Sequence, residues 1–526
     1  MLSGKDMATP SEKLAESLQI LKEFQERGQI AIRSKELPRV HRERLLKSGF
    51  IRDVIKGWYI PARPDETMGE STAWYASYWD FCRTYLKYRF DERWSLSPEQ
   101  SLLLLVGNRT VPIQLLLRSP RARNQITKLV HKTSLLEVRG ALPSRQERQS
   151  LNGLNIFNLQ SALIQVPAEF YRRYPTEARA SLLMIRDASE ILSPLLGGGH
   201  SVVAGRLAGA FRNIGRNRIA DEILAGMRAA GYSVTENDPF VTVLPNLIPS
   251  RERSPYVNRI RLMWQTMREP ILELFPKPMG LPKKVEPYMN NVMDSYVLDA
   301  YHSLSIEGYR VSPELIERVR SGKWNPDEDP NDKTHRDAMA AKGYWDSFQA
   351  VQESLKRILK GENSGMVVDD DHSDWYRKLF GASVTTGLLK PSDLAGYRNS
   401  DVFIRRSMHV PPNADAVRDS MPVYFELLRE EKEAQIRVVL GHFIFVYIHP
   451  YMDGNGRMGR FLMNAMLASG GYPWTVIPTA SRTEYMKALE AASVNQDIVP
   501  FAEFISGLVK NSIKGKAPSL PGASSK

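Results

Sequence analysis

The stretch from His449 to Arg460 carries, in one short run, the side chains that phosphate chemistry requires: His-Pro-Tyr-Met-Asp-Gly-Asn-Gly-Arg-Met-Gly-Arg. An imidazole such as that of His449 titrates near neutrality when unperturbed, which suits it to take a proton from a hydroxyl group. The carboxylate of Asp453 is an oxygen ligand of the kind that Mg²⁺ binds together with substrate phosphates. A base and a metal carboxylate in one segment indicate transfer of a phosphoryl-type group from a nucleotide.

The glycines of the same stretch predict where the phosphates bind. Gly454 and Gly456 flank Asn455, so successive backbone N–H groups can converge on one anion at the start of a helix, where the helix dipole favours negative charge. Arg457 and Arg460 project to one side of that helix and can bind further phosphate oxygens. The alternative is an ordinary glycine-containing loop between two core helices, with His449 as the C-terminal residue of the first. That alternative leaves the combination of base, carboxylate, glycines and arginines unexplained.

Two helices must position this loop. The apolar run from Ile436 to Ile448 predicts a helix that ends because Pro450 disfavours helical backbone at the residue before it. Residues 461–468 continue a second helix, which we expect to end at the glycine pair 470–471. The motif is therefore expected in a helix–loop–helix connection, with the glycines opening the second helix.

The motif resembles the signature of the Fic family, His-x-Phe-x-(Asp/Glu)-Gly-Asn-Gly-Arg-x-x-Arg, with Tyr451 in place of the usual Phe. The resemblance extends over about residues 287–509 and implies an all-helical domain with a small β-hairpin flap that pairs with an extended target segment. Residues 396–412 match the flap, which would include Val402, Phe403 and Ile404. Residues 481–485 resemble the helix that follows the motif, with Tyr485 at the nucleotide site.

The same resemblance implies a protein adenylyltransferase, which transfers AMP from ATP to a Ser, Thr or Tyr hydroxyl of a protein, with the chain itself among the candidate targets. His449 would deprotonate that hydroxyl, and Asp453 would hold Mg²⁺ on the α- and β-phosphates. The nest formed by Gly454, Asn455 and Gly456 would bind the α-phosphate. Arg457 would neutralise phosphate charge, and Arg460 would take the γ-phosphate.

An inhibitory helix is implied by Ser303-Leu-Ser-Ile-Glu307-Gly308, which resembles the family pattern (Ser/Thr)-x-x-x-Glu-(Gly/Asn) and lies N-terminal to the motif. By this resemblance Glu307 pairs with Arg460, displaces the γ-phosphate and leaves ATP in an unproductive pose. The alternative is a plain helix end, with Gly308 just after the last turn and Glu307 on the surface.

The N-terminal region predicts a second binding function. The chain has 526 residues and a formal net charge of +12, which makes an anionic partner plausible. A short helix capped by Ser34 and a second helix at 39–47, followed by a hairpin at 50–60, predict a winged helix that binds duplex DNA. Its basic residues are Arg33, Lys35, Arg39, Arg42, Arg44, Lys47, Arg52 and Lys56. Residues 30–230 resemble antitoxin-type regulators of abortive-infection systems, whereas the alternative is a solvated basic face on a small helical domain.

The predicted fold is mainly α, with the Fic domain preceded by a winged helix and an α+β region that contains strand-like apolar runs at 102–106 and 111–117. We divide the chain into an N-terminal extension (1–28), a winged-helix DNA-binding-like domain (29–70), an α+β regulator-like domain (71–240), a connector (241–285), the Fic domain with its inhibitory helix (286–510) and a disordered tail (511–526).

Other features exclude whole classes of protein. A single cysteine, Cys82, excludes an intrachain disulfide and a Cys-rich zinc site. Residues 1–28 lack the apolar core of a signal peptide, and the apolar runs fall short of the roughly 20 residues of a membrane span. We therefore expect a cytoplasmic protein without membrane contact.

Two other functions remain open from the sequence. In one, the chain is a transcriptional regulator or antitoxin whose Fic domain senses nucleotide; the intact His449, Asp453 and Arg460 favour the enzyme over this sensor. In the other, the same residues remove AMP from a modified target, with Glu307 positioning water. No motif encodes the nucleotide preference, the target protein or the DNA operator. The oligomeric state, for which a homo-oligomer is possible, is not encoded either.

Overall fold

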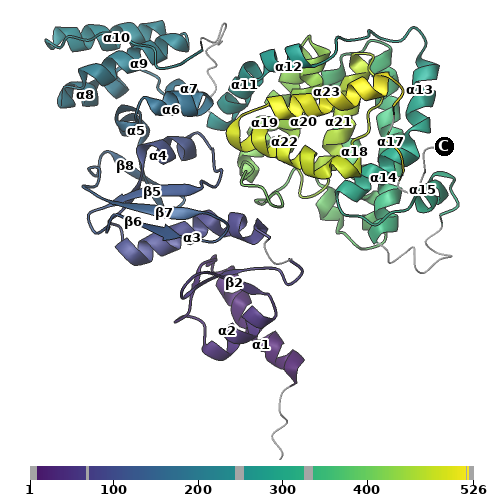
Figure 1. The fold of residues 1–526 in the computed structure, drawn as a ribbon, viewed down its shortest axis with the longest axis horizontal. Helices are drawn as coiled ribbons and strands as arrows, with labels where there is room; N and C mark the ends of the chain where they lie inside the picture. Colours follow the sequence, from purple (N-terminus) through teal and green to yellow (C-terminus); the bar gives the residue numbers. More distant parts are fainter. Residues whose placement is uncertain (1–8, 67–69, 243–253, 325–335, 517, 521–526) are drawn as a thin grey trace, which may run out of the picture. The chain divides into compact units, whose positions relative to one another are not determined.

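The computed structural model describes residues 9–66, 70–242, 254–324, 336–516 and 518–520, and helices predominate within them (Figure 1). The chain forms two compact units. The first unit comprises residues 1–255 together with 403–410, and the second comprises 256–402 and 411–526. All strands of the described residues lie in the first unit. The predicted mainly helical fold is therefore confirmed.

The first unit begins with two helices and a three-stranded sheet of order β1-β3-β2. These elements are α1 (Pro10–Glu26), β1 (Ile32–Arg33), α2 (Arg39–Lys47), β2 (Ile51–Ile55) and β3 (Trp58–Pro61). A capping box at Thr9 starts α1, whose Leu21 and Phe24 share a buried cluster with Leu45 of α2. The helix at 39–47 and the hairpin after it are as predicted, but the helix expected after Ser34 is a turn, in which the Glu36 N–H donates to the Arg33 carbonyl at 2.9 Å. The assignment of these elements to a winged helix stays a prediction.

A four-stranded sheet of order β4-β5-β7-β6 follows, beside the hairpin β8-β9. The elements are α3 (Thr72–Phe90), β4 (Ser95–Leu96), α4 (Pro98–Leu105), β5 (Gln114–Ser119), β6 (Gln125–Lys128), β7 (Ser134–Arg139), β8 (Arg148–Leu151) and β9 (Leu154–Phe157). The expectation of a strand at 102–106 was wrong, because these leucines belong to α4. Ser97 caps that helix by accepting a hydrogen bond from the Gln100 N–H at 3.2 Å, and Pro98 occupies its first turn.

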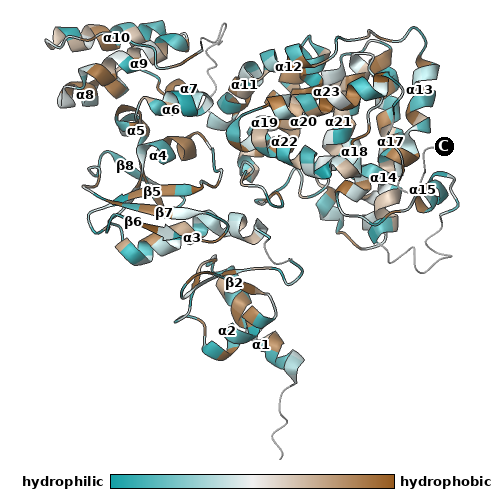
Figure 2. Ribbon diagram, in the orientation of Figure 1, coloured by the Kyte–Doolittle hydropathy of each residue, from teal (hydrophilic) through white to brown (hydrophobic). Residues whose placement is uncertain are grey.

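Six helices complete the first unit: α5 (Leu159–Gln165), α6 (Glu169–Arg173), α7 (Pro175–Leu183), α8 (Ser189–Gly198), α9 (Ser201–Asn213) and α10 (Asn217–Ala229). Figure 2 shows hydrophilic and hydrophobic residues alternating along α10, as expected for a helix with one buried face. On α9, a Cβ at Gly205 would lie 2.0 Å from the Thr235 carbonyl oxygen. Only glycine allows the chain after α10 to pack this closely.

The predicted β-hairpin flap is absent. Residues 396–412 contain no strand in the described structure, and residues 403–410 are part of the first unit. The Ser407 N–H donates to the Ile404 carbonyl at 3.1 Å, which forms a turn, and the Met408 carbonyl accepts the Val111 N–H at 2.9 Å. The segment is therefore held by residues distant in sequence, and its backbone groups do not pair with each other as a hairpin.

The second unit is helical. Its elements are α11 (Pro255–Thr266), α12 (Arg268–Leu274), α13 (Val285–Asp294), α14 (Tyr296–Ile306), α15 (Pro313–Arg320), α17 (Arg336–Leu359), α18 (Ser364–Thr385), η1 (Pro391–Leu394), α19 (Ala414–Glu430), α20 (Ala434–Ile448), α21 (Asn455–Ser469), η2 (Thr479–Ser481), α22 (Arg482–Asn495) and α23 (Val499–Ile513). Of the predicted connector, 243–253 lie outside the described residues, as do 517 and 521–526 of the predicted tail.

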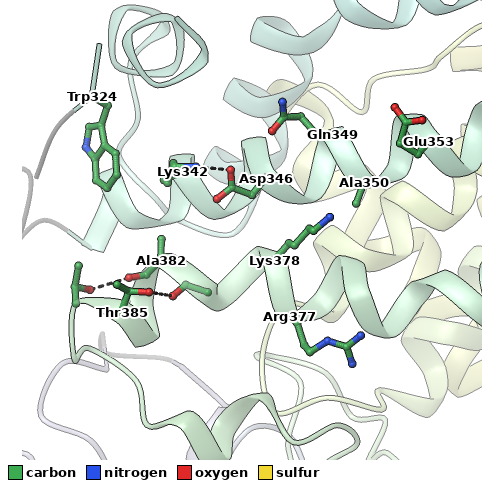
Figure 3. Close-up of a pocket in the computed structure, with 12 residues that line it drawn as sticks. Trp324, Lys342, Asp346, Gln349, Ala350, Glu353, Arg377, Lys378, Ala382 and Thr385 are labelled. Atoms are coloured by element: carbon green, nitrogen blue, oxygen red, sulfur yellow. Dashed lines mark hydrogen bonds and ion pairs between the residues drawn. The ribbon is translucent and has the colours of Figure 1, made fainter. Parts of the chain in front are cut away.

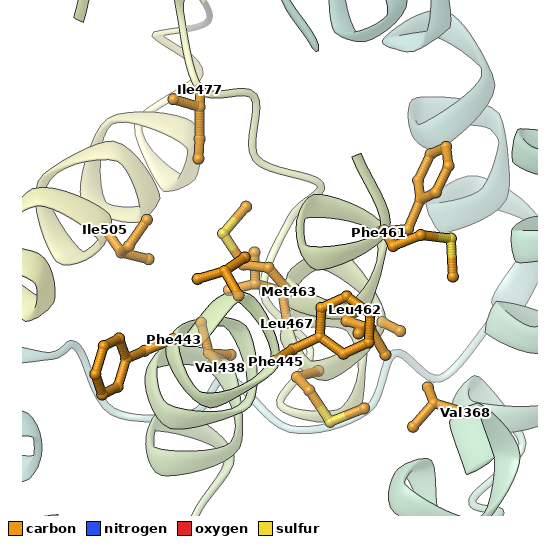
Figure 4. Close-up of a cluster of buried hydrophobic side chains, with 14 of the residues drawn as sticks. Val368, Val438, Phe443, Phe445, Phe461, Leu462, Met463, Leu467, Ile477 and Ile505 are labelled. Atoms are coloured by element: carbon orange, nitrogen blue, oxygen red, sulfur yellow. The ribbon is translucent and has the colours of Figure 1, made fainter. Parts of the chain in front are cut away.

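The core of the second unit is built around α20 and α21. Every residue of α20 is buried except Arg437, so its sequence reads as one apolar run. Figure 4 shows Phe445 of α20 beside Leu462 of α21, whereas the ring of Phe443 points away from α21, and all three residues belong to one buried cluster. The loop between these helices is therefore fixed at both ends by close-packed side chains. None of the helices in the described ranges is long and apolar enough to cross a membrane.

Candidate active site

His449 ends helix α20 in a left-handed conformation, with φ at 54°. Its N–H donates to the Phe445 carbonyl at 3.0 Å, and the helix stops where Pro450 predicted. The ring Nδ1 lies 3.1 Å from the Val446 carbonyl oxygen. Because a carbonyl only accepts, Nδ1 carries the proton and Nε2 keeps the lone pair. Burial lowers the pKa of His449 to about 4, so the imidazole is neutral at pH 7 and can act as a base.

The loop after His449 is braced by its own side chains. Asn455 Oδ1 accepts the Tyr451 N–H at 2.9 Å, and Asn455 Nδ2 donates to the Tyr451 carbonyl at 2.8 Å. The Tyr451 ring stacks on Tyr376 with centroids 3.8 Å apart. Asn455 thus uses its side chain to hold the loop, so only its backbone N–H remains for the predicted contact with a phosphate.

Gly454 and Gly456, the glycines of the predicted nest, lie at the start of α21. Gly454 has φ at 81°, and a Cβ there would lie 2.8 Å from the Phe380 ring. At Gly456 a Cβ would lie 2.3 Å from Oε1 of Glu307. The carboxylate of Glu307 therefore lies directly over the helix N-terminus, in the place where the helix dipole and free N–H groups attract an anion.

Arg460 is the partner of that carboxylate. Its Nη2 donates to Glu307 Oε1 at 2.7 Å and to the Ser303 carbonyl at 3.0 Å, and its Nε donates to Ser303 Oγ at 2.8 Å. Burial alone would lower the pKa of Arg460, but the Glu307 carboxylate together with the nearby Tyr485 and Tyr344 raises it, so the net shift is upward. Gly308, with φ at 90°, turns the chain after Glu307. Glu307 is thus a helix end and an ion-paired residue at the same time, with a side chain only 29% exposed.

Arg457 is 1% exposed and lies between two aromatic rings, 5.1 Å from the Tyr309 centroid and 4.9 Å from that of Phe380. Its Nη2 is 3.6 Å from Asp453 Oδ1, whereas the Asp453 side chain is 61% exposed. In the described part of the chain, Arg457 Nε and Nη2 and Arg460 Nη1 are buried without a hydrogen-bond acceptor. Buried guanidinium groups with unused donors fit the oxygens of a phosphate chain.

The exposed carboxylate of Asp453 fits Mg²⁺. No cluster of three or more His, Cys, Asp or Glu side chains that could bind a metal occurs among residues the structure describes. Mg²⁺ does not require such a cluster, because it keeps several waters and binds through one or two carboxylates plus substrate phosphates. Asp453, beside the anion-binding turn, is the side chain that would hold it.

Tyr485, predicted to line the nucleotide site, is buried beneath it. Its hydroxyl is 2.7 Å from His442 Nε2, and His442 Nδ1 is 2.9 Å from the Gly459 carbonyl oxygen. Burial lowers the pKa of His442 to about 3, so the ring stays neutral and its Nε2 accepts a hydrogen bond from the Tyr485 hydroxyl. Arg460 lies close enough to Tyr485 to influence its pKa. Tyr485 therefore braces α21 and Arg460 from behind.

Arg398, expected only as part of the flap, has a second role that no motif predicted. This arginine is 1% exposed. Its Nε donates to the His449 carbonyl at 2.8 Å, its N–H to the Pro450 carbonyl at 2.9 Å and its Nη1 to the Ser400 carbonyl at 2.9 Å, while its Nη2 donates to the Pro412 carbonyl. Arg398 therefore ties both ends of segment 399–411 to the catalytic loop. In the sequence, the position of Arg398 directly after Gly396 and Tyr397 and before this segment is the one feature that could have indicated such a role.

A cleft of about 750 Å³ lies elsewhere, between α17 and α18 (Figure 3). Lys342 there pairs with Asp346, and Lys378 pairs with Asp374 at 3.0 Å. The cleft contains none of the motif residues, and these ion pairs leave its lysines neutralised. We do not assign the chemistry to it.

Comparison with known proteins agrees with the motif. Residues 371–467 match the Fic/DOC family, from within α18 to α21. Over 274 residues, 51% of the chain, the sequence is 26% identical to a protein adenylyltransferase Fic from Nematostella vectensis, of which it covers 58%. Over 224 residues, 42% of the chain, it is 26% identical to a protein adenylyltransferase Fic from Drosophila willistoni, of which it covers 41%.

Among solved structures, a fragment of Fic-1 from C. elegans matches with a TM-score of 0.37 and 18% sequence identity, covering 65% of this chain and 96% of that one. The chain spans about half the length of the curated relatives it matches. Through the region that contains the motif, the chain is similar to the Fic/DOC family and to proteins named protein adenylyltransferase Fic.

Proposed function

We propose that the chain is a protein adenylyltransferase, which transfers AMP from ATP to a hydroxyl group of a protein. One observation carries the proposal: a neutral imidazole at His449 stands in the same loop as an anion-binding helix start and the buried, unused donors of Arg457 and Arg460. A base beside a phosphate site is what attack of a hydroxyl on a nucleotide requires.

In this reaction His449 Nε2 takes the proton of the target hydroxyl, whose oxygen forms a bond to the α-phosphorus of ATP. The bond from that phosphorus to the bridging oxygen breaks, and pyrophosphate leaves. The first turn of α21 and Arg457 would bind phosphate oxygens and stabilise their charge. Mg²⁺, held by Asp453, would supply further neutralisation of the phosphates when bound.

We further propose that the chain is inhibited by Glu307. Its carboxylate lies over Gly456 and is hydrogen-bonded to Arg460 at 2.7 Å, the position a terminal phosphate needs. Two anions compete for one arginine, so ATP binds without its phosphates in the reactive arrangement. Removal of AMP from a target would use the same residues, with Glu307 holding the attacking water.

A second candidate function is duplex-DNA binding by the first unit. Lys47 at the end of α2 and Lys56 in the β2–β3 turn are exposed on adjoining elements, as in a helix and wing that contact phosphates. Several basic residues that motivated the prediction are already paired: Arg33 with Glu36 at 2.7 Å, and Arg39 with Glu43 at 2.6 Å. The binding face is therefore smaller than the sequence predicted.

The direct test is to incubate the full chain, as wild type and as Glu307→Gly, with labelled ATP and Mg²⁺ in a cell lysate. Adenylyl transfer predicts label on the chain or on lysate proteins, with a mass increase of one AMP group. Label lost from a pre-modified protein would support AMP removal instead. Nucleotide binding without either reaction would leave the nucleotide-sensing regulator.

A further inference from the structure

Segment 399–411 leaves the second unit and returns to it close to the catalytic histidine. Its two ends are joined by Arg398, which donates hydrogen bonds to the carbonyls of Ser400 and Pro412 and, at 2.8 Å, to the carbonyl of His449. Its central part, residues 403–410, belongs to the first unit. The side chain of Arg398 therefore connects the backbone of His449, the proposed base, to a segment whose central residues, 403–410, belong to the first unit.

The hold on residues 403–410 is specific. Glu70 Oε2 accepts a hydrogen bond from Arg405 Nη2 at 2.8 Å, and the Glu70 side chain is only 2% exposed. The hydrogen bond from Arg405 lowers the pKa of Glu70 to about 2, so this carboxylate is charged throughout the physiological range. The Arg406 N–H donates to Thr72 Oγ1 at 3.1 Å, and this hydroxyl in turn donates to Glu70 at 3.2 Å.

Apolar contacts add to the ion pair. Val410 is 4% exposed and belongs to the main hydrophobic cluster of the first unit, and Met408 packs against that cluster. The Val111 N–H is bound to the Met408 carbonyl at 2.9 Å. Release of the segment would expose Val410 and leave Glu70 buried without its cation, and the second of these is the more costly.

We propose that the N-terminal unit controls adenylyl transfer through this segment, with Glu70 and Arg405 as a latch and Arg398 as the positioning residue that connects the segment to His449. The proposal rests on the proposed function, because it names a regulation of that site. Any partner that binds the first unit and disturbs Glu70 would loosen residues 403–410. The loop that holds His449, and the residues a protein target meets beside it, would then lose their fixed position.

The latch can be tested on the full chain by hydrogen–deuterium exchange. In Glu70→Gln and in Arg405→Glu, we expect the amides of residues 403–410 to exchange about tenfold faster, with a smaller increase around His449. Arg405 is 64% exposed, so replacing it does not threaten the core. The exchanged pair, Glu70→Arg with Arg405→Glu, should recover part of the protection.

Glu137→Gln is the matched control, because this carboxylate is also buried in the first unit and paired with an arginine, Arg89, at 2.7 Å. If it accelerates exchange at 403–410 as much as Glu70→Gln does, or if neither Glu70→Gln nor Arg405→Glu has an effect there, the latch is refuted.

Transfer is measured separately, as labelled AMP incorporated in a Glu307→Gly background. We expect loss of the latch to lower transfer about 3- to 30-fold while the KM for ATP stays unchanged. If the parent shows no transfer at all but exchange responds as expected, the proposed function fails and the mechanical coupling stands. Unchanged transfer despite faster exchange would refute control of the reaction by this segment.

Discussion

The arginines of the motif and those of the N-terminal helix–hairpin region have the same chemistry and opposite surroundings. Arg457 and Arg460 are buried, and both have N–H groups without acceptors among the described residues. Arg39, in contrast, has a side chain that is 80% exposed and pairs with Glu43 on the next turn of its helix. An ion pair of this exposed kind contributes little to stability.

The difference shows which cations indicate a ligand. A buried guanidinium with unused N–H donors lowers the stability of the fold unless an anion binds to it. Such a group therefore indicates a binding site. An exposed arginine can pair with a neighbouring glutamate at little cost, and its count in the sequence says little about partners. The net charge of +12 therefore carries less information than two buried arginines. The experiments that follow test this difference between the buried site and the exposed N-terminal cations.

The largest effect is expected for His449→Ala. Without Nε2 nothing takes the proton from the target hydroxyl, and transfer should fall by about a hundred- to ten-thousandfold. ATP affinity, which depends on the helix start and the arginines, should change less than about twofold. Calorimetric titration with ATP and intact-protein mass spectrometry measure the two quantities separately. Substantial transfer by this variant would remove His449 from the role of base.

The second effect concerns Glu307, whose carboxylate is hydrogen-bonded to Arg460. Glu307→Gly should raise transfer about ten- to a thousandfold, because each tenfold of repression corresponds to about 1.4 kcal/mol and one partly buried ion pair can supply a few. Glu307→Gln is the control, since it keeps the size and removes the charge. If neither variant gains activity while Arg460→Ala loses it, Glu307 is an ordinary helix-end residue.

The third prediction addresses the N-terminal region. Three exposed lysines outside the Arg33–Glu36 and Arg39–Glu43 pairs, Lys35, Lys47 and Lys56, remain to contact phosphates. With about three contacts, the affinity of the full chain for duplex DNA should fall about fortyfold between about 50 and 200 mM salt. Lys47→Glu combined with Lys56→Glu should abolish binding in a fluorescence-anisotropy titration. The absence of binding at low salt would leave only a solvated basic face.

The sequence predicted the backbone of the loop between α20 and α21 well because the signals there are local. Pro450 ends α20 at His449, and Gly454 starts α21 with φ at 81°, a conformation that other residues do not readily adopt. The placement of Glu307 could be expected only from resemblance to a family. It depends on a contact between residues 153 positions apart, and no local pattern encodes such a contact.

Predictions failed where distant contacts decide the local structure. Val402, Phe403 and Ile404 read as a strand, yet the segment they begin is held by Glu70, which lies 335 residues from Arg405. The strand expected at 102–106 failed for a local reason instead, because the Ser97 cap and Pro98 in the first turn start α4. The pairing of Arg33 with Glu36 was not predicted, so neither was the loss of that charge for DNA binding.

The smallest expected effect is the pH dependence of transfer. The base acts when neutral, so its contribution to the rate is full well above its pKa and is lost as the pH falls through that value. Burial lowers the pKa of His449 to about 4, so at pH 5 the rate should be only about 10% below its value at neutral pH. An exposed histidine with an ordinary pKa of about 6.5 would lose about thirtyfold over the same range.

A pH–rate profile of Glu307→Gly distinguishes these cases, and an NMR titration of the His449 ring, assigned by its absence in His449→Gln, shows which group titrates. The sign also fixes the effect on stability. The unfolded chain binds a proton at His449 below about pH 6.5, whereas the folded chain does so only below about pH 4. The free energy of unfolding therefore decreases as the pH is lowered from about 6.5 to about 4. A ring that titrates near 6.5 in the folded chain would show that solvent reaches His449 freely. In that case only Arg457 and Arg460 would be buried, and His449 would be as exposed to solvent as the N-terminal arginines.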